Sequence, residues 1–264
     1  MTRVGFQGEP GAFSEDAARQ LVTDAQPVGY RTFDDLVEAV SHADVDVGLL
    51  PIENTIAGPI ARSYDLLWDH AEITIIDETV YRVVQCLIGV RGATVDDIKE
   101  VRSHPVALEQ CRGLLARHPN WSAQIVDDTA GAVRAIVDLA DKSVAAIASR
   151  LAAEVYHADV LIDGVQDDSE NFTRFFLIAR DGRPRRQLKR ACVALQLAHT
   201  PGSLRDALSS FSDEHLNLRS LVSRPARRGT FEYTFYCEVE NAEGAALDRA
   251  LAKINGVARI LGRY

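Results

Sequence analysis

Ligand-type spacing of cysteine and histidine is missing from this sequence. Cys86, Cys111, Cys192 and Cys237 lie far apart and form no C-x-x-C pair. The seven histidines form no H-x-x-x-H pattern or other ligand spacing. Scattered thiols in a chain of 264 residues are typical of reduced core side chains. We therefore expect neither a disulfide framework nor a metal site.

Long apolar runs and an excess of positive charge are also missing. The chain enters its first expected strand directly from Met1, without an apolar signal region, and nowhere do about eighteen apolar residues follow one another. The net charge of −9 argues against a nucleic-acid partner, because phosphate binding needs a basic surface. A small anionic substrate is compatible with this charge, since it responds to local groups. We expect a cytoplasmic protein with neither a membrane nor a nucleic-acid partner.

Short apolar runs alternate with helical patterns up to residue 180, which predicts an α/β fold with two lobes. Lobe 1 is expected at about 1–76 and 165–180, and lobe 2 at about 77–164. Strands are predicted at 4–6, 45–50, 73–76, 83–90, 101–102, 125–126, 144–148 and 175–179. Helices are expected to begin at Ser14, to cover 33–43, to run from Gly58-Pro59 to about His70, to begin at Asp96 and Pro105, to cover 130–139 and to begin at Ser149.

The pattern changes after residue 180. Residues 181–190 carry Arg183, Arg185, Arg186, Lys189 and Arg190, which indicates a solvated linker or an anion patch, the linker being favoured. Residues 191–264 then show the order βαββαβ, typical of a small ferredoxin-like α+β module. Its strands are predicted at 191–197, 216–222, 231–239 and 258–260, and its helices at 202–213 and 245–254.

Polar residues follow the strands of lobe 1. Gly5, Gly8 and Gly11 are spaced G-x-x-G-x-x-G, which does not match the dinucleotide-binding pattern and favours a tight turn presenting amides to a cleft. Glu53, Asn54 and Thr55 follow the strand that ends near Leu50, where open α/β sheets bind ligands. A plain turn with a helix cap is the alternative.

Lobe 2 repeats this arrangement. Ser103-His104-Pro105 precedes a helix that carries Gln110, and Thr129 stands at another helix start, where it could simply be a cap. Because the Ser-His pair has no evident third partner, we reject hydrolase chemistry.

Asn171-Phe172-Thr173-Arg174-Phe175 is a more specific segment. It places a hydroxyl beside a permanent cation, which suits a bidentate contact to a carboxylate. The alternative is ordinary strand alternation, with Phe172 in the core and Arg174 on the surface.

Together these segments resemble the prephenate dehydratase family, over nearly the whole chain and in the family's order. The resemblance implies a two-lobed catalytic domain similar to type II periplasmic binding proteins, at 1–180, and an ACT regulatory domain at 191–264. It is carried by Gly5-Phe6-Gln7-Gly8, Gly11-Ala12-Phe13-Ser14, Leu50-Pro51-Ile52-Glu53-Asn54-Thr55 with Gly58, Ser103-His104-Pro105 with Gln110-Cys111, Ala145-Ala146-Ile147-Ala148-Ser149 and Asn171-Phe172-Thr173-Arg174-Phe175.

The resemblance further implies a lyase that converts prephenate to phenylpyruvate, water and carbon dioxide without a cofactor. Thr173 is then the proton donor to the departing hydroxyl or a group that only positions it. Arg174, Glu53 and Asn54 join Thr173 as catalytic residues. Thr55, Ser103, Gln110, Thr129, Asn171 and Phe175 are the expected substrate-binding residues.

The resemblance also implies phenylalanine as an effector of the ACT domain and assembly into a homodimer or homotetramer. Two departures stand out, since the family's Gly-Ala-Leu is Gly202-Ser203-Leu204 here and its Glu-Ser-Arg-Pro begins with Val222. No chorismate mutase segment precedes the match, so a monofunctional enzyme is expected. An arogenate dehydratase and a non-catalytic amino-acid sensor are the alternatives. The expected effector residues are Gly202, Ser203, Leu204, Asn217, Leu218, Ser223, Arg224 and Pro225.

Overall fold

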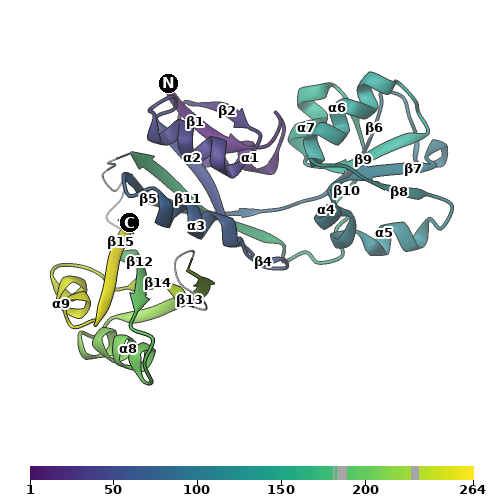
Figure 1. The fold of residues 1–264 in the computed structure, drawn as a ribbon. Coiled ribbons are helices and arrows are strands. Elements are labelled where there is room, and N and C mark those ends of the chain that lie inside the picture. Colours follow the sequence, from purple (N-terminus) through teal and green to yellow (C-terminus); the bar gives the residue numbers. More distant parts are fainter. Residues whose placement is uncertain (181, 183–188, 227–231) are drawn as a thin grey trace.

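The computed structural model describes residues 1–180, 182, 189–226 and 232–264. Two β-sheets organise the chain, each covered by helices, which confirms the predicted α/β class (Figure 1). None of the helices in the described ranges has the length and apolar composition that a membrane span requires. The basic residues Arg183, Arg185 and Arg186 of the expected linker lie outside the described residues.

Lobe 1 is built on five long strands. β1, β2 and β3 are parallel, whereas β11 is antiparallel to both β3 and β5. Helix α1 packs on one face of this sheet, and α2 and α3 pack on the other. The elements are β1 (Thr2–Gln7), α1 (Phe13–Leu21), β2 (Ala25–Tyr30), α2 (Phe33–Ser41), β3 (Val47–Asn54), β4 (Gly58–Pro59), α3 (Ala61–Asp69), β5 (Ile73–Arg82) and β11 (Phe172–Arg180).

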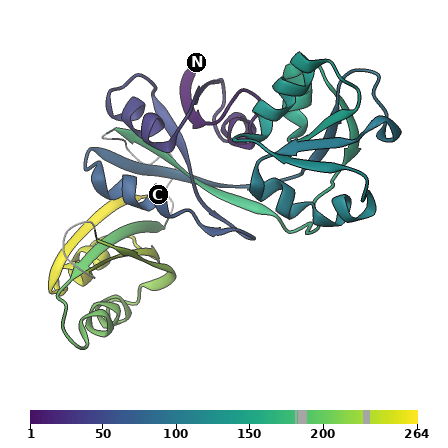
Figure 2. The ribbon, with the colours of Figure 1, turned by 45° about the vertical axis from the view of Figure 1, so that its right-hand side comes forward.

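Lobe 2 has its own sheet, in the order β10-β6-β9-β7-β8. The chain enters this lobe after β5 and returns before β11, and the Val83 amide donates to the Asn171 carbonyl where the two crossings run side by side (2.8 Å; Figure 2). The elements are β6 (Cys86–Gly89), η1 (Val95–Asp97), β7 (Glu100–Ser103), α4 (Pro105–Gln110), α5 (Arg112–Arg117), β8 (Ser122–Ile125), α6 (Thr129–Leu139), β9 (Val144–Ala148), α7 (Arg150–Tyr156) and β10 (Asp159–Asp163).

The C-terminal unit confirms the predicted βαββαβ order. Its four strands are antiparallel, in the order β13-β14-β12-β15, with both helices packed on one face. Its elements are β12 (Arg190–Leu197), α8 (Ser203–Asp213), β13 (Asn217–Pro225), β14 (Tyr233–Glu240), α9 (Ala246–Ala252) and β15 (Gly256–Arg263).

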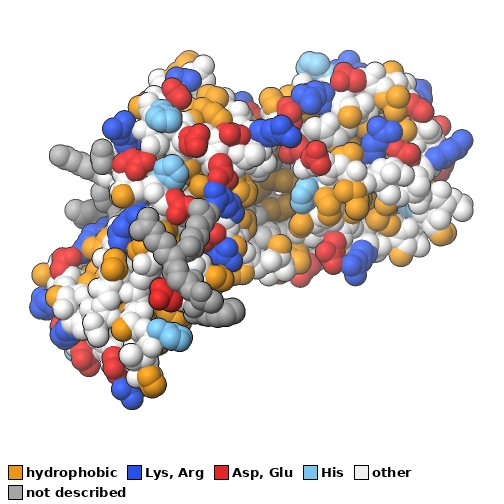
Figure 3. All heavy atoms as spheres, in the orientation of Figure 1, with side chains coloured by type: hydrophobic (Ala, Val, Ile, Leu, Met, Phe, Trp, Pro, Cys, Tyr) orange, Lys and Arg blue, Asp and Glu red, His pale blue; other side chains and the backbone are white. Residues whose placement is uncertain are grey.

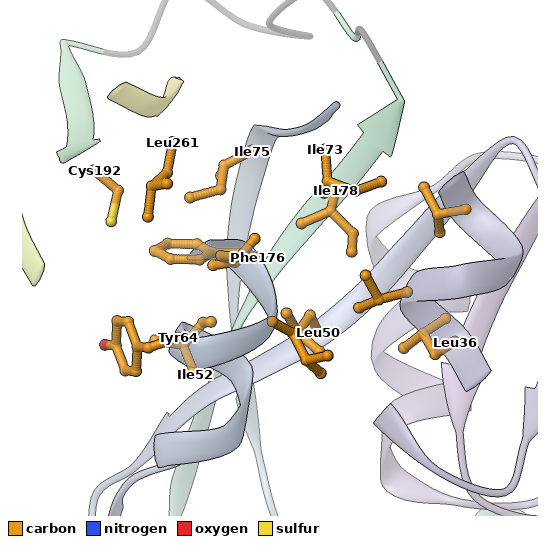
Figure 4. Close-up of a cluster of buried hydrophobic side chains, with 14 of the residues drawn as sticks. Leu36, Leu50, Ile52, Tyr64, Ile73, Ile75, Phe176, Ile178, Cys192 and Leu261 are labelled. Atoms are coloured by element: carbon orange, nitrogen blue, oxygen red, sulfur yellow. The ribbon is translucent and has the colours of Figure 1, made fainter. Parts of the chain in front are cut away.

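The C-terminal sheet continues into the sheet of lobe 1. β15 pairs with β5 through Gly262 and Ile75, so the strands of the C-terminal unit and those of lobe 1 belong to one continuous sheet. A Cβ atom at Gly262 would lie 2.3 Å from the Ile75 carbonyl oxygen, so the pairing requires glycine. The cores also merge, because Phe176 of β11 packs among Ile75, Cys192 and Leu261 (Figure 4). Burial of all four cysteines as free thiols confirms their expected place in the core.

A smaller contact joins the units beside α3. Arg259 of β15 donates to the carbonyl oxygens of Leu67 and Trp68, at 2.5 and 2.7 Å. Its guanidinium carbon lies 5.6 Å from the centre of the Trp68 ring. These contacts fix the end of α3 to the C-terminal sheet.

Three expected helix starts are wrong. Ala12, not Ser14, is the N-cap of α1, and the Glu15 carboxylate reaches back to the Gly11 amide (2.7 Å). Gly58–Pro59 forms strand β4 against β3, so α3 begins only at Ala61. The helix expected from Asp96 is a single 3-10 turn, because the next amide, at Lys99, donates to Ser143 of the sheet region instead. Strands β2 and β10 were not predicted.

Candidate functional site

Asn54 and Thr173 lie side by side at the ends of two adjacent strands. They are register partners in the β3–β11 pair, and Asn54 Nδ2 donates to Thr173 Oγ1 at 3.0 Å. Asn54 Oδ1 accepts the amides of Ile56 and Ala57, at 3.0 and 2.9 Å. These two bonds fix the orientation of the amide, so its N–H groups face the hydroxyl.

A chain of amide side chains extends from this pair into lobe 2. Asn54 Nδ2 also donates to Asn171 Oδ1 (2.8 Å), and Asn171 Nδ2 donates to Gln110 Oε1 at the end of α4 (3.0 Å). Gln85 Nε2 donates to the same Gln110 oxygen at 3.1 Å. The structure thus brings together Thr173, Asn54, Asn171 and Gln110, four of the predicted site residues.

Gln85 was missed by sequence reasoning. It is buried, and its Oε1 has no hydrogen-bond partner among the described residues. The available signal was a single amide inside the apolar run from Val83 to Val90. Buried amide side chains need hydrogen-bond partners, so this lone amide was a signal for a further polar residue near the site.

Thr55 links the end of β3 to the segment that leads into β11. Its Oγ1 donates to the Glu170 carbonyl (2.7 Å) and accepts the Phe172 amide (2.9 Å). The hydroxyl predicted to bind substrate is therefore held by backbone groups, and it fixes the segment that carries Asn171 and Thr173.

The lobe 2 turns also use their predicted groups internally. Ser103 Oγ donates to the Ile147 carbonyl (2.6 Å), which ties β7 to β9. His104 Nδ1 accepts the Val106 amide as the N-cap of α4. Asp128, not Thr129, caps α6 by accepting the Gly131 amide at 2.6 Å. Burial raises the pKa of the Asp128 carboxyl above its ordinary value.

Arg174 and Glu53 do not join Asn54 and Thr173, contrary to the sequence-based expectation. Arg174 is buried rather than on the surface, and its carboxylate partners are protein side chains, Glu238, Glu53 and Glu78. Burial lowers the pKa of Arg174, but the hydrogen bonds to Glu238 and Glu53, with the charge of Glu238, contribute to a pKa that lies above the ordinary value. Arg174 is therefore a fixed cation on the side of the C-terminal unit.

Strand alternation explains this separation. Phe175, a predicted substrate-binding residue, is buried with α1 in the core of lobe 1, whereas Phe176 packs toward the C-terminal unit. Side chains alternate between the faces of a strand, so Thr173 shares the first face and Arg174 the second. Phe172 is only half-buried and Arg174 is buried, so the alternative of plain strand alternation, with Phe172 in the core and Arg174 on the surface, is wrong.

The two lobes also meet at the Gly-rich turn. Ser149 Oγ donates to the Gly11 carbonyl at 2.5 Å, and Glu9 pairs with Arg134 at 3.0 Å. The expected tight turn is present, but the Gly8 and Gly11 amides donate to Tyr30 and Glu15, not toward a ligand. Beside this contact lies a cavity of about 810 Å³ between the lobes, lined by residues that include Gln7, Tyr30, Asp128 and Arg134. Figure 3 shows the surface hollowed between the lobes.

The expected effector residues occupy two places. Ser203 and Leu204, which follow Gly202 at the start of α8, line a cavity of about 140 Å³ with Tyr233 and Phe235. Arg224 instead pairs with Asp65 of α3 (2.9 Å), and Pro225 lines a different cavity of about 570 Å³. Asn217, Leu218 and Ser223 lie along β13, where Asn217 Nδ2 donates to Glu240.

The fold and site define an α/β protein with a hydroxyl–amide pair at the junction of two lobes. Residues 4–183 match the family described as prephenate dehydratase. Arogenate dehydratase/prephenate dehydratase 2, chloroplastic, of Arabidopsis thaliana is 36% identical over 279 residues, covering 99% of this chain and 72% of that protein. Arogenate dehydratase 2 of Petunia hybrida is 36% identical over 282 residues, covering 99% and 71%.

Two solved structures share this fold over nearly the whole chain. A prephenate dehydratase from Arthrobacter aurescens in complex with L-Phe has a TM-score of 0.89 at 27% identity, covering 98% of this chain and 88% of that one. GqqA, described as a novel type of quorum quenching acylase, has a TM-score of 0.89 at 31% identity, covering 98% and 96%. The chain belongs to the prephenate dehydratase family, whose enzymes are lyase-type dehydratases that also decarboxylate.

Proposed function

We propose that this enzyme converts prephenate to phenylpyruvate, water and carbon dioxide, with Thr173 as the group that assists the departing hydroxyl. The observation that carries this proposal is the 3.0 Å bond from Asn54 Nδ2 to Thr173 Oγ1. Because the amide donates to the hydroxyl oxygen, the Thr173 proton is left to point at a substrate. A hydroxyl so arranged can donate to a leaving oxygen.

The reaction balances without an oxidant or reductant. The proton moves from Thr173 Oγ1 to the ring hydroxyl as the ring C–O bond breaks and water leaves. The C–C bond to the ring carboxylate breaks at the same time, its electrons enter the ring, and carbon dioxide departs. The Asn54 N–H stabilises the negative charge that develops on Thr173 Oγ1, and a proton from solvent restores the hydroxyl. Aromatisation drives the step, so we propose that it needs no cofactor.

Steady-state turnover of prephenate with phenylpyruvate as readout tests this function. Thr173→Val keeps the shape of the side chain and removes the proton, so kcat should fall roughly 100-fold or more, whereas Thr173→Ser should keep most activity. Absence of turnover in the wild type, or full activity in Thr173→Val, refutes the proposal. Binding of an aromatic amino acid without turnover would identify the sensor alternative.

Arogenate is the second candidate substrate, favoured by the names of the curated relatives. It loses the same groups and differs by an ammonium in place of the ketone. The ratio of kcat/KM on the two substrates decides between them, and a higher value for arogenate would displace prephenate from the proposal.

Hydrolysis of the kind described for GqqA has less support from the site. Ser103 Oγ donates to the Ile147 carbonyl and His104 Nδ1 accepts the Val106 amide, so the two side chains have different partners. Hydrolysis of an N-acyl amide, measured with the same protein preparations, can be compared with the turnover of prephenate. Hydrolysis that is lost in Ser103→Ala would support the acylase function.

We further propose that the C-terminal unit is an ACT domain that binds phenylalanine at the start of α8 and assembles through its free edge. The cavity beside Ser203 and Leu204 has aromatic walls, and β13 is the last strand of the sheet. An unpaired edge favours pairing with a second copy. Calorimetric titration with phenylalanine and sedimentation analysis test the two parts.

The four buried free thiols also support a reducing compartment such as the cytoplasm.

A further inference from the structure

The ion pair between Arg174 and Glu238 joins strand β11 to the C-terminal unit. Arg174 Nη1 lies 2.5 Å from Glu238 Oε2, and Arg174 Nη2 lies 2.5 Å from Glu238 Oε1. The side chains are 8% and 3% exposed. Two parallel charged bonds of this kind fix orientation as well as distance, because a planar guanidinium must meet both carboxylate oxygens at once.

Further groups hold the same guanidinium. Glu53 of β3 lies 3.1 Å away and Glu78 of β5 lies 3.4 Å away, while the Phe176 ring centre lies 5.5 Å from the guanidinium carbon. Glu78 is shared with Arg190 and Arg219. A buried cation needs such partners, and among the three carboxylates only Glu238 meets it with two bonds.

Arg174 and Thr173 share one stretch of the backbone of β11. The two residues are neighbours on β11, and their register partners Glu53 and Asn54 are neighbours on β3. A bulge at this point leaves Ile52 without a register partner and places Glu53 beside Arg174. Bulges aim side chains at a fixed place in a sheet, so this bulge directs the Glu53 carboxylate at Arg174, whose backbone continues directly into that of Thr173.

We propose that Glu238 is a positioning residue for the dehydration, acting through Arg174 to hold Thr173 Oγ1 against Asn54 Nδ2. The proposal rests on the proposed function of Thr173. The C-terminal unit is then a structural part of the active site, and a ligand that moves β14 alters turnover through this ion pair.

Glu238→Gln tests the link, because it keeps the shape of the side chain and removes its charge. A matched control is Asp65→Asn, which removes another carboxylate that pairs with an arginine across the contact between lobe 1 and the C-terminal unit, Arg224 at 2.9 Å. We expect kcat of Glu238→Gln to fall roughly tenfold or more with KM within about twofold, because only the geometry of the reacting step changes. Asp65→Asn should keep kcat within about twofold.

Amide hydrogen exchange of the peptide covering 171–176 gives a readout that needs no substrate. Exchange should be faster in Glu238→Gln than in the wild type and Asp65→Asn, and Glu238→Asp should recover part of the lost kcat. Equal kcat and equal exchange in Glu238→Gln and Asp65→Asn overturn the proposal. If Glu238→Gln does not fold, Glu238→Asp carries the test, since the shortened carboxylate must still lower kcat more than Asp65→Asn does. Absence of turnover in the wild type refutes the proposed function alone, because exchange still measures the link.

Discussion

At the scale of single residues, Asn54 joins three segments. Its amide nitrogen donates to Asn171, to the Phe172 carbonyl and to Thr173, while its oxygen accepts two amides of the following turn. A side-chain amide supplies both functions, because its nitrogen carries two N–H groups and its oxygen has two acceptor sites. Asn54 therefore stabilises the contact between the end of β3 and the start of β11, and it also orients the Thr173 hydroxyl.

Asn54→Asp separates these functions. The new carboxylate can still accept the turn amides, but its second oxygen faces the acceptors Asn171 Oδ1 and the Phe172 carbonyl. We expect the free energy of unfolding to fall by about 2 kcal/mol, because buried acceptors are left without donors, and kcat to fall with it. Denaturant unfolding and turnover measure the two effects. The same substitution at exposed Asn120 should change stability by less than about 0.5 kcal/mol. Equal midpoints for the two variants would contradict the assigned role.

Asp128 gives a pH-dependent prediction. Burial raises its pKa in the folded state above the unfolded value of about 3.8. The folded state thus holds the proton more tightly, so the contribution of Asp128 to stability is complete below the unfolded pKa and is lost as pH rises through the folded pKa. Asp128→Asn keeps an oxygen for the Gly131 amide and has no charge to bury.

Asp128→Asn should therefore melt at a higher temperature than the wild type at pH 7, with a difference that shrinks toward pH 4. Thermal unfolding across this range measures the difference. Asp127→Asn, at the exposed neighbouring position, is the control. A constant difference at all pH values would show that burial of the charge is not the cause.

At the scale of elements, helix α2 begins with a reciprocal cap. Thr32 Oγ1 accepts the Asp35 amide at 3.0 Å, and the Asp35 carboxylate accepts the Thr32 amide at 3.2 Å. Thr32→Ala should lower the free energy of unfolding by about 1 kcal/mol, whereas Thr32→Ser keeps the acceptor and should lower it by much less. Denaturant midpoints compare the two, and equal losses would show that the methyl group, not the hydroxyl, stabilises the start of the helix.

Elements with clear local signals were predictable from the sequence. β9 and α2 follow from an apolar run and from helical periodicity, and the pair Asn54 and Thr173 follows from its place at strand ends. β2 was not predicted because Pro27 and Gly29 are unusual in a strand and because its pairing with β1 is a tertiary contact. The role of Arg174 could not be predicted, because its partner Glu238 lies on β14, brought near only where β15 meets β5.

At the scale of the whole molecule, the distance between the lobes depends on Gly11. This residue has φ of +91°, and a Cβ atom there would lie 2.6 Å from Ala152 Cα in lobe 2. Gly164 has φ of +68° and open space around it. The two positions share a backbone conformation that favours glycine, but only Gly11 lies at the contact between lobes.

Gly11→Ala should force the lobes apart and lower kcat/KM roughly tenfold or more, because the groups of the two lobes would no longer align. Gly164→Ala should cost about 1 kcal/mol of stability and leave kcat/KM little changed. Kinetics and small-angle X-ray scattering measure both. Unchanged kinetics in Gly11→Ala would mean that the contact at this turn does not set the working geometry.

Because Arg259 stacks on Trp68, tryptophan fluorescence can report on the contact between α3 and the C-terminal unit. The chain has two tryptophans, and the second, Trp121, stacks on His118 in lobe 2 with ring centres 3.8 Å apart. Replacement of Trp121 by phenylalanine would leave one indole, whose emission reports the surroundings of α3 where it meets the C-terminal unit. Stopped-flow fluorescence of that variant would time the response of the junction to an added amino acid, without any label on the protein.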